Sequence, residues 1–300
     1  MKKLWASFLT LCLACLLFSA CSQGEGIDGA ETDDDGRLRV VCSVYPVYDF
    51  TQKITGDIAQ VTLLVPPGVE APDWEPSPAD IVMLEKADLL VLNGAGMEFW
   101  SEKVLSALEN EAIIVLDSSA AIPLRLAGGD REESHDGHDE DSEDHDHEEH
   151  NHGEYDPHVW LAPLNAQKQM EAIAQALAEA DPENEEAYRE NYRQYAQKCA
   201  GLDEEYRAAL EDLPRRSFIV AHEAYGYLCA AYGLTLIGVE GFPPASEPDP
   251  ARMAQLVDLM KYTGIDPVFY ESRASPKVAE AIARSTGARV DVLNPLARLS

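Results

Sequence analysis

Short apolar runs alternate with amphipathic segments along the first part of the chain. Four runs, rich in β-branched and aliphatic residues, have the length of buried strands and lie at 37–46, 61–67, 88–94 and 112–119. The segments between them, "VYDFTQKITG", "PADIVMLEKA" and "FWSEKVLSALEN", carry apolar residues at helical spacing. Strands that alternate with helices predict a parallel sheet with both faces covered.

The same alternation returns towards the end of the chain, with predicted strands at 217–221, 234–240, 267–272 and 288–294. Between these two units the pattern is helical. One helix runs from Leu164 to Ala180, and a second continues after Pro182 for about 31 residues, or ~46 Å, although Gly201 weakens it locally. We predict an α/β fold of two lobes with parallel sheets, joined by a long helix. Ligands of such folds bind at the carboxyl ends of strands, usually in a cleft between lobes.

The N-terminus has the pattern of an export signal. Two lysines precede an apolar run at 4–20, which is short for a transmembrane helix of ~20 residues or more, and Cys21 follows. The stretch "LLFSAC" resembles a bacterial lipobox, with Phe18 where leucine is common. We expect residues 1–21 to be a lipoprotein signal peptide, with lipid on Cys21; an uncleaved membrane anchor is the alternative. Either arrangement predicts an extracytoplasmic, membrane-anchored protein, at a cell surface or in a periplasm.

Charge and composition divide the rest of the chain. The stretch 22–36 is acidic and glycine-rich and predicts a flexible tether, and 128–153 has almost no apolar residues and predicts a mobile loop. The net charge of −31 argues against nucleic-acid binding and suits a surface that collects cations. The predicted plan is a signal peptide (1–21), a tether (22–36), an N-terminal lobe (37–163) that includes the loop, a helical linker (164–214) and a C-terminal lobe (215–300).

Seven of the eight histidines fall between His135 and Trp160. His158, directly after the loop, and His222, at a strand–helix junction, lie near the predicted cleft and could begin a zinc site, although a lone histidine before a helix is more often a cap or a packed residue. The others lie in the loop among acidic residues and could bind divalent cations weakly: His135, His138, His145, His147, His150 and His152. A solvated acidic spacer is the alternative interpretation of the loop.

Catalytic motifs and cysteine pairs are absent from the sequence. There is no HExxH, GxSxG or P-loop motif, so we expect no enzyme. Cys42, Cys199 and Cys229 form no CxxC pair; we expect buried thiols, although a disulfide between the last two is possible.

Eight stretches together resemble the metal-specific solute-binding lipoproteins of bacterial ABC importers, in particular the zinc-uptake type. They are "VYPVYDFTQKITGD", "VTLLVPPGVEAPDWEPSPADI", "ADLLVLNGAGMEFW", "DPHVWLAP", "AHEAYGYLCAAYGL", "EPDPARMAQLVDLMK", "SPKVAEAIARSTGA" and "LNPL". They span nearly everything from Val44 to Leu296 apart from the loop and the long helix, and an acidic histidine-rich loop is itself a feature of zinc-specific members.

The resemblance implies two α/β lobes joined by a long rigid helix, with one metal ion in the cleft between them. The second and third metal histidines of the family fall on His158 and His222, but the first falls on Pro72, which cannot coordinate zinc. The family's fourth ligand, often a carboxylate, lies near "LNPL", where this chain offers Asn294. Relatives continue into a final helix, so the resemblance also implies a truncated or altered end at Ser300.

Other side chains could complete a four-ligand site. We rank Glu70 first, then a loop histidine such as His152, then Asp73 and Glu271, each of which could equally be a cap or a surface ion-pair partner. Two histidines favour Zn²⁺ over Mn²⁺.

The resemblance predicts a monomeric receptor that captures Zn²⁺ and delivers it to the permease of an ABC importer in the membrane. The alternative is a surface metal-buffering or adhesive lipoprotein with a degenerate site. A receptor for a metal chelate such as a siderophore is disfavoured by "DPHVW" and by the loop.

Overall fold

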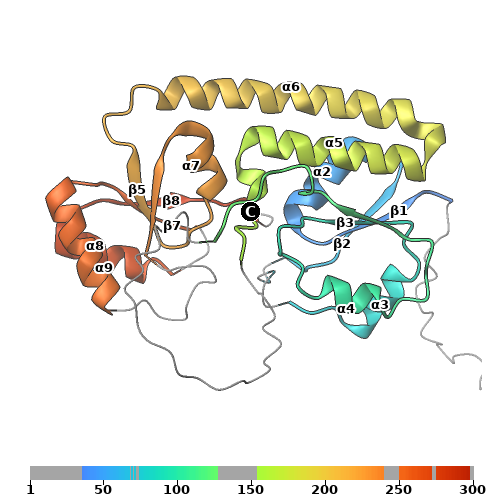
Figure 1. The fold of residues 1–300 in the computed structure, drawn as a ribbon, viewed down its shortest axis with the longest axis horizontal. Helices are drawn as coiled ribbons and strands as arrows, with labels where there is room; N and C mark the ends of the chain where they lie inside the picture. Colours follow the sequence, from blue (N-terminus) through green and yellow to red (C-terminus); the bar gives the residue numbers. More distant parts are fainter. Residues whose placement is uncertain are drawn as a thin grey trace, which may run out of the picture. The chain divides into compact units, whose positions relative to one another are not determined.

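Two parallel β-sheets with helices packed around them organise the part of the chain that the structure describes (Figure 1). The structure is a computed structural model and describes residues 36–67, 69, 71, 74–127, 154–239, 250–271 and 275–297. Both sheets belong to one unit that begins at Leu38. Several predictions therefore lie outside the described residues: the signal peptide with Cys21, nearly all of the tether, the loop 128–153 with its six histidines, Glu70, Pro72 and Asp73.

The first sheet has the strand order β2-β1-β3-β4, and all its neighbouring strands are parallel. Its strands are β1 (Arg39–Cys42), β2 (Gln60–Leu63), β3 (Leu89–Leu92) and β4 (Ile114–Asp117). The central β3 is buried throughout, as its continuous apolar run predicts for a strand covered on both faces. We call this sheet and its helices the N-terminal lobe.

The second sheet repeats this plan with the order β6-β5-β7-β8, again parallel. Its strands are β5 (Ser217–Val220), β6 (Thr235–Gly238), β7 (Val268–Glu271) and β8 (Val290–Leu293). A separate apolar cluster around Ile219, Val268 and Ile282 forms its core. This sheet and its helices form the C-terminal lobe, so the predicted fold of two parallel-sheet lobes is confirmed.

The helices and 3₁₀ turns between the strands are α2 (Tyr45–Thr55), α3 (Pro78–Leu84), α4 (Ser101–Leu105), η2 (Val159–Leu161), α5 (Pro163–Ala180), η3 (Pro182–Asn184), α6 (Glu185–Leu210), α7 (Gly226–Tyr232), α8 (Pro250–Thr263) and α9 (Lys277–Thr286). Among the described residues, every helix is too short or too polar to serve as a membrane span.

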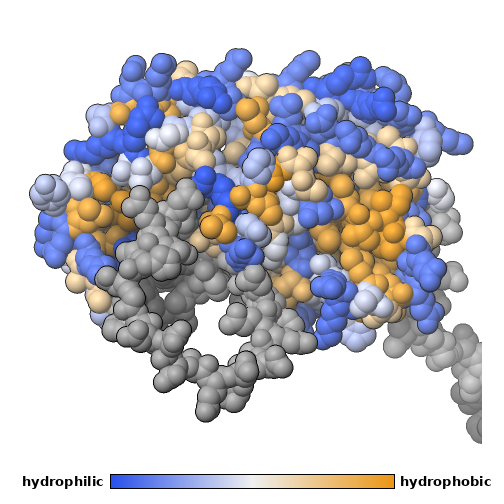
Figure 2. Space-filling model, viewed as in Figure 1, coloured by the Kyte–Doolittle hydropathy of each residue, from blue (hydrophilic) through white to orange (hydrophobic). Residues whose placement is uncertain are grey.

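The long helix α6 connects the lobes mechanically. Its 26 residues extend ~39 Å, and it packs against α2 and α5 at the N-terminal lobe and against α7 at the C-terminal lobe. It continues through Gly201 without interruption. Figure 2 shows hydrophilic residues along the exposed side of α6 and a hydrophobic area over the first sheet. A helix braced on both lobes restricts their relative movement.

Several predicted elements are longer than the observed ones. The predicted strand 37–46 ends at Cys42, because Pro46 already lies in the first turn of α2, where a missing N–H costs nothing. The helix expected from His222 begins only at Gly226, so His222 lies in an irregular turn. The long helix begins at Glu185, because a 3₁₀ turn occupies the three preceding residues. Apolar residues continue beyond each element into buried turns, so the pattern alone does not mark the ends.

The cysteines Cys42, Cys199 and Cys229 are all free thiols in the described chain. Cys42 and Cys229 are buried, and burial raises the pKa of each thiol to about 12. Both are therefore neutral at physiological pH, as expected for packing thiols rather than metal ligands.

Candidate metal centre

His158 and His222 lie side by side although they are far apart in the sequence. His222 follows β5 at its carboxyl end, and His158 directly precedes η2. Their ring centroids are 5.0 Å apart, with an angle of 74° between the ring planes. The neighbours of His158, Val159 and Trp160, pack in the core of the N-terminal lobe, so the two histidines come from different lobes.

Asp156 fixes the orientation of His158. Its Oδ1 lies 2.8 Å from Nδ1 of the His158 ring and also accepts the His158 backbone N–H at 2.9 Å. His158 is only 5% exposed, so the ring has little freedom. A carboxylate at Nδ1 favours the tautomer with its proton there, which leaves Nε2 as the nitrogen suited to bind a metal ion.

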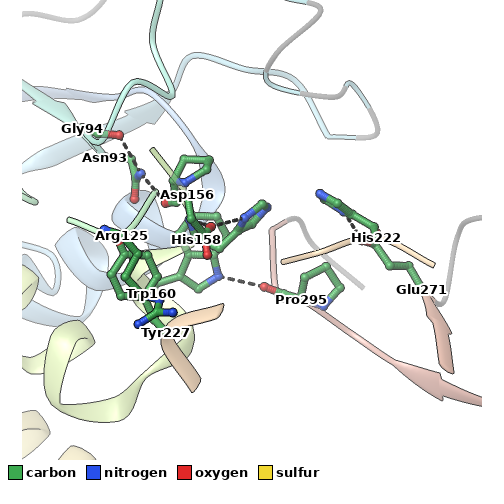
Figure 3. A network of polar contacts seen from close by, with 11 residues as sticks. Asn93, Gly94, Arg125, Asp156, His158, Trp160, His222, Tyr227, Glu271 and Pro295 are labelled. Carbon is green, nitrogen blue, oxygen red and sulfur yellow. Dashed lines mark hydrogen bonds and ion pairs between the residues drawn. The ribbon is translucent and has the colours of Figure 1, made fainter. Parts of the chain in front are cut away.

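Glu271 plays the same part for His222. Its Oε1 lies 2.5 Å from Nδ1 of the His222 ring, and both side chains are largely buried. Figure 3 shows the two rings facing each other, with Asp156 on the far side of His158 and Glu271 on the far side of His222. The Nε2 side of each ring is therefore directed to the space between the lobes. This carboxylate–histidine arrangement is the one that orients histidine ligands in metal sites.

Glu271 and Asn294, two further ligand candidates, make other contacts in this structure. Glu271 contacts the Nδ1 side of His222, opposite the nitrogen that would face a metal, so it orients the ring. The Asn294 Oδ1 accepts the Leu296 backbone N–H at 2.9 Å and closes a local turn. Within the described ranges, no group of three or more His, Cys, Asp or Glu side chains is placed to hold a metal ion. The other candidates, Glu70, Asp73 and the loop histidines, belong to the residues not described.

A close approach to helix α7 locates Asp156 between the lobes. A Cβ on Gly226, the first residue of α7, would lie 2.5 Å from Asp156 Oδ2. Next to this contact the Arg125 backbone N–H donates to the Tyr227 hydroxyl at 3.1 Å. Asp156 therefore orients His158 through one oxygen while its other oxygen rests on the C-terminal lobe. Only glycine at position 226 allows this approach.

Trp160 makes a second connection between the lobes. Its indole Nε1–H donates to the Pro295 carbonyl at 2.8 Å, while its ring contacts His158 at a centroid distance of 5.3 Å (Figure 3). Asp156, Gly226 and Trp160 are site residues that the sequence did not predict. Asp156 had a usable signal, because an Asp two positions before another residue often caps that residue's backbone N–H.

Comparison with known proteins agrees with this architecture. Residues 40–300 match the profile of the family ZnuA, described as zinc-uptake complex component A, periplasmic. The chain is 37% identical over 300 residues to the high-affinity zinc uptake system protein ZnuA of Bacillus subtilis, covering 100% of this chain and 91% of that protein.

A second relative is longer. The chain is 35% identical to the zinc-binding lipoprotein AdcA of Streptococcus pneumoniae over all 300 residues, but it spans only 56% of AdcA. The crystal structure of the Zn(II)-bound ZnuA-like domain of that AdcA superposes with a TM-score of 0.72 at 32% identity, covering 88% of this chain and 90% of the domain. The chain belongs to the ZnuA family of zinc-uptake components.

Proposed function

We propose that the protein is an extracytoplasmic receptor that captures Zn²⁺ and delivers it to an ABC-type importer in the membrane. One observation carries the proposal. His158 and His222 face each other across the lobes, each with a carboxylate on its Nδ1, so that both Nε2 atoms are directed to one place. Two imidazoles suit zinc better than manganese. Family membership supports the same function.

The proposed ligand set consists of His158 and His222 through Nε2, with Glu70 as a further ligand and water completing the four positions. Pro72 stands where the family usually has its first metal histidine. Fewer imidazole ligands bind zinc more weakly, so Pro72→His should lower the zinc dissociation constant. An unchanged dissociation constant would show that position 72 does not face the ion.

Capture rather than catalysis fits the proposed site, because the Nδ1 atom of each histidine meets a carboxylate, as in histidines that are oriented for metal binding. In the proposed arrangement Cys21 carries the lipid, the tether spaces the lobes from the membrane, and the loop histidines raise the local zinc concentration. The protein acts as a monomer beside the importer permease. An adhesive or metal-buffering role remains the alternative, and dependence of zinc uptake on this protein in its own cells distinguishes the two.

Zinc titration of the full-length protein in detergent, against a competing chelator, tests the site. His158→Ala and His222→Ala should each abolish the tight site, whereas His152→Ala, the matched loop variant, should leave it intact. A further variant without residues 132–152 separates the loop from the site. Unchanged tight binding in His158→Ala or His222→Ala, or no tight binding in the parent protein, would refute the proposed site.

A further inference from the structure

A turn with Gly94 and Ala95 buried follows β3 and lies next to the segment that carries His158. Three successive residues, Gly94, Ala95 and Gly96, have positive φ angles of 82°, 53° and 78°. A left-handed conformation is unfavourable for alanine, so interactions around the turn must maintain it. The turn is therefore held in one defined conformation by its surroundings.

Glu98 holds this turn from inside. Its Oε1 accepts the Asn93 backbone N–H at 2.8 Å and the Ser43 hydroxyl at 2.6 Å, and its Oε2 accepts the Gly94 backbone N–H at 3.0 Å. Glu98 is 6% exposed and Asn93 is fully buried. Hydrogen bonds to a carboxyl group in a dry environment restrain their donors strongly. The backbone of Asn93 is thus fixed in position at the carboxyl end of β3.

The side chain of Asn93 is fixed as well, and it reaches the metal-site segment. Its Nδ2 donates to the Pro157 carbonyl at 2.9 Å and to the Gly94 carbonyl at 3.0 Å. Its Oδ1 accepts from Gln169 Nε2 at 3.1 Å, which determines which end of the amide faces Pro157. Figure 3 shows Asn93 directed at the segment that contains Asp156 and His158.

The peptide between Pro157 and His158 is consequently held at both of its polar ends. Asn93 binds its carbonyl, and Asp156 binds its N–H. These two contacts fix the plane of that peptide, and the plane sets the direction in which the His158 side chain leaves the backbone. Of these two contacts, the one from Asp156 stays within the same short segment, whereas the one from Asn93 ties the peptide to the sheet.

We propose that Asn93 is a positioning residue for zinc capture: it anchors the Pro157 carbonyl to the end of β3 and so holds His158 where it can share an ion with His222. The Glu98-bound turn and Gln169 keep Asn93 in that orientation. The inference rests on the proposed function, because it takes His158 as a zinc ligand. A site with two histidine ligands has little redundancy, so displacement of one ligand weakens binding directly.

Asn93→Ala tests the proposal, with Asn110→Ala as the matched control. Asn110 is an amide that also donates to a backbone carbonyl, that of Ala87, at 3.0 Å, but it lies at the amino end of the same strands. The full-length protein in detergent is used for both variants. We expect Asn93→Ala to weaken zinc binding roughly 10-fold, at the lower end of the loss that removal of a group supporting a ligand causes. Asn110→Ala should bind zinc as the parent protein does.

A second readout follows the ring of His158 without zinc. The imidazole NMR signals of His158, assigned by comparison with His158→Ala, should shift or broaden in Asn93→Ala and stay unchanged in Asn110→Ala. This readout separates the role of Asn93 from the proposed function. If His158→Ala still binds zinc as tightly as the parent protein, the proposed function fails. The zinc-free signals of the parent protein and of Asn93→Ala still show whether Asn93 positions the ring.

Gln169→Leu is the second variant, because it keeps Asn93 but removes the side chain that donates to Asn93 Oδ1. If Asn93→Ala does not fold, Gln169→Leu tests the positioning role of Asn93 instead. It should weaken zinc binding less than Asn93→Ala does. The proposal is overturned if the folded variants bind zinc like the parent protein with unchanged His158 signals. It is also overturned if Asn110→Ala weakens binding as much as Asn93→Ala, since the effect would then follow general stability.

Discussion

At the scale of single residues, Asp156 serves His158 twice through one oxygen atom. The same Oδ1 meets the ring Nδ1 and the backbone N–H, so ring orientation and backbone position are coupled. Its negative charge also stabilises a ring that is bound to a cation. An amide in its place could keep one hydrogen bond but would lose this charge.

Asp156→Asn should therefore weaken zinc binding by roughly 10- to 100-fold while the fold persists. Asp88→Asn is the control, because Asp88 bonds the Arg39 side chain and backbone at the amino end of the same sheet, away from the site. Competition titration with a chelator of known affinity measures both variants. Equal zinc affinity in Asp156→Asn and the parent protein would contradict the role given to this carboxylate.

Glu98 gives a residue-scale prediction about pH. Burial raises its pKa from 4.5 to about 7, although hydrogen bonds from Ser43 and from two backbone N–H groups oppose the shift, and the charge of Asp117 adds to it. The folded protein thus keeps a proton that the unfolded chain releases above about pH 4.5. This difference in proton binding contributes roughly 3 kcal/mol to the free energy of unfolding. The contribution is fully present below about pH 4.5 and is lost as the pH rises through about 7.

Glu98→Gln should remove this pH dependence. Urea unfolding of the parent protein and of Glu98→Gln between pH 4.5 and 8 gives the difference between their free energies of unfolding. As the pH rises, the free energy of unfolding of Glu98→Gln should increase relative to that of the parent protein by up to roughly 3 kcal/mol. Curves that run parallel over this range would show that Glu98 is ionised in the fold throughout.

At the scale of elements, the start of α7 is one place where the two lobes meet. Gly226→Ala places a methyl group 2.5 Å from Asp156 Oδ2, so the carboxylate and the attached His158 must move. We expect a loss of roughly 1–3 kcal/mol in stability and a weaker zinc site. Gly201→Ala in α6 is the control, since nothing lies within 4 Å of its added methyl group. It should stabilise the protein by up to about 1 kcal/mol and leave zinc affinity unchanged.

The elements themselves could largely be predicted from the sequence, because each strand and helix carries its own periodicity. Their ends could not. The predicted strand 88–94 includes Asn93 and Gly94, which the structure places in the turn held by Glu98. No local sequence pattern shows that the Glu98 carboxyl group will accept hydrogen bonds from those backbone N–H groups. The supporting roles of Asn93 and Glu98 were therefore not predicted.

The residues of the site, like the elements, could be predicted only in part from the sequence. His158 and His222 could be selected from their positions at predicted element ends and from the family resemblance. Their carboxylate partners differ in how easily the sequence reveals them. Asp156 is two residues from His158. Glu271 is 49 residues from His222 and contacts it because β7 lies beside β5. Strand order in a parallel sheet is a property of the whole lobe, so sequence spacing alone could not show that Glu271 lies against the His222 ring.

At the scale of the whole molecule, an ion shared by His158 and His222 would join the lobes. Each lobe has its own apolar core, and α6 already packs against both. A ligand that binds only the folded state stabilises it by mass action, by about 2.7 kcal/mol at a free concentration 100 times its dissociation constant. Because His158 and His222 belong to different lobes, stabilisation by a shared ion should reach both sheets.

Hydrogen exchange of backbone amides in β1 and β5 measures this effect for each lobe separately. We expect zinc to slow exchange in both strands of the parent protein and in neither strand of His158→Ala or His222→Ala. His152→Ala should respond like the parent protein, because its histidine lies in the loop. Protection of one sheet alone would mean that the ion is held by a single lobe. The proposed site, which takes one histidine from each lobe, would then be wrong.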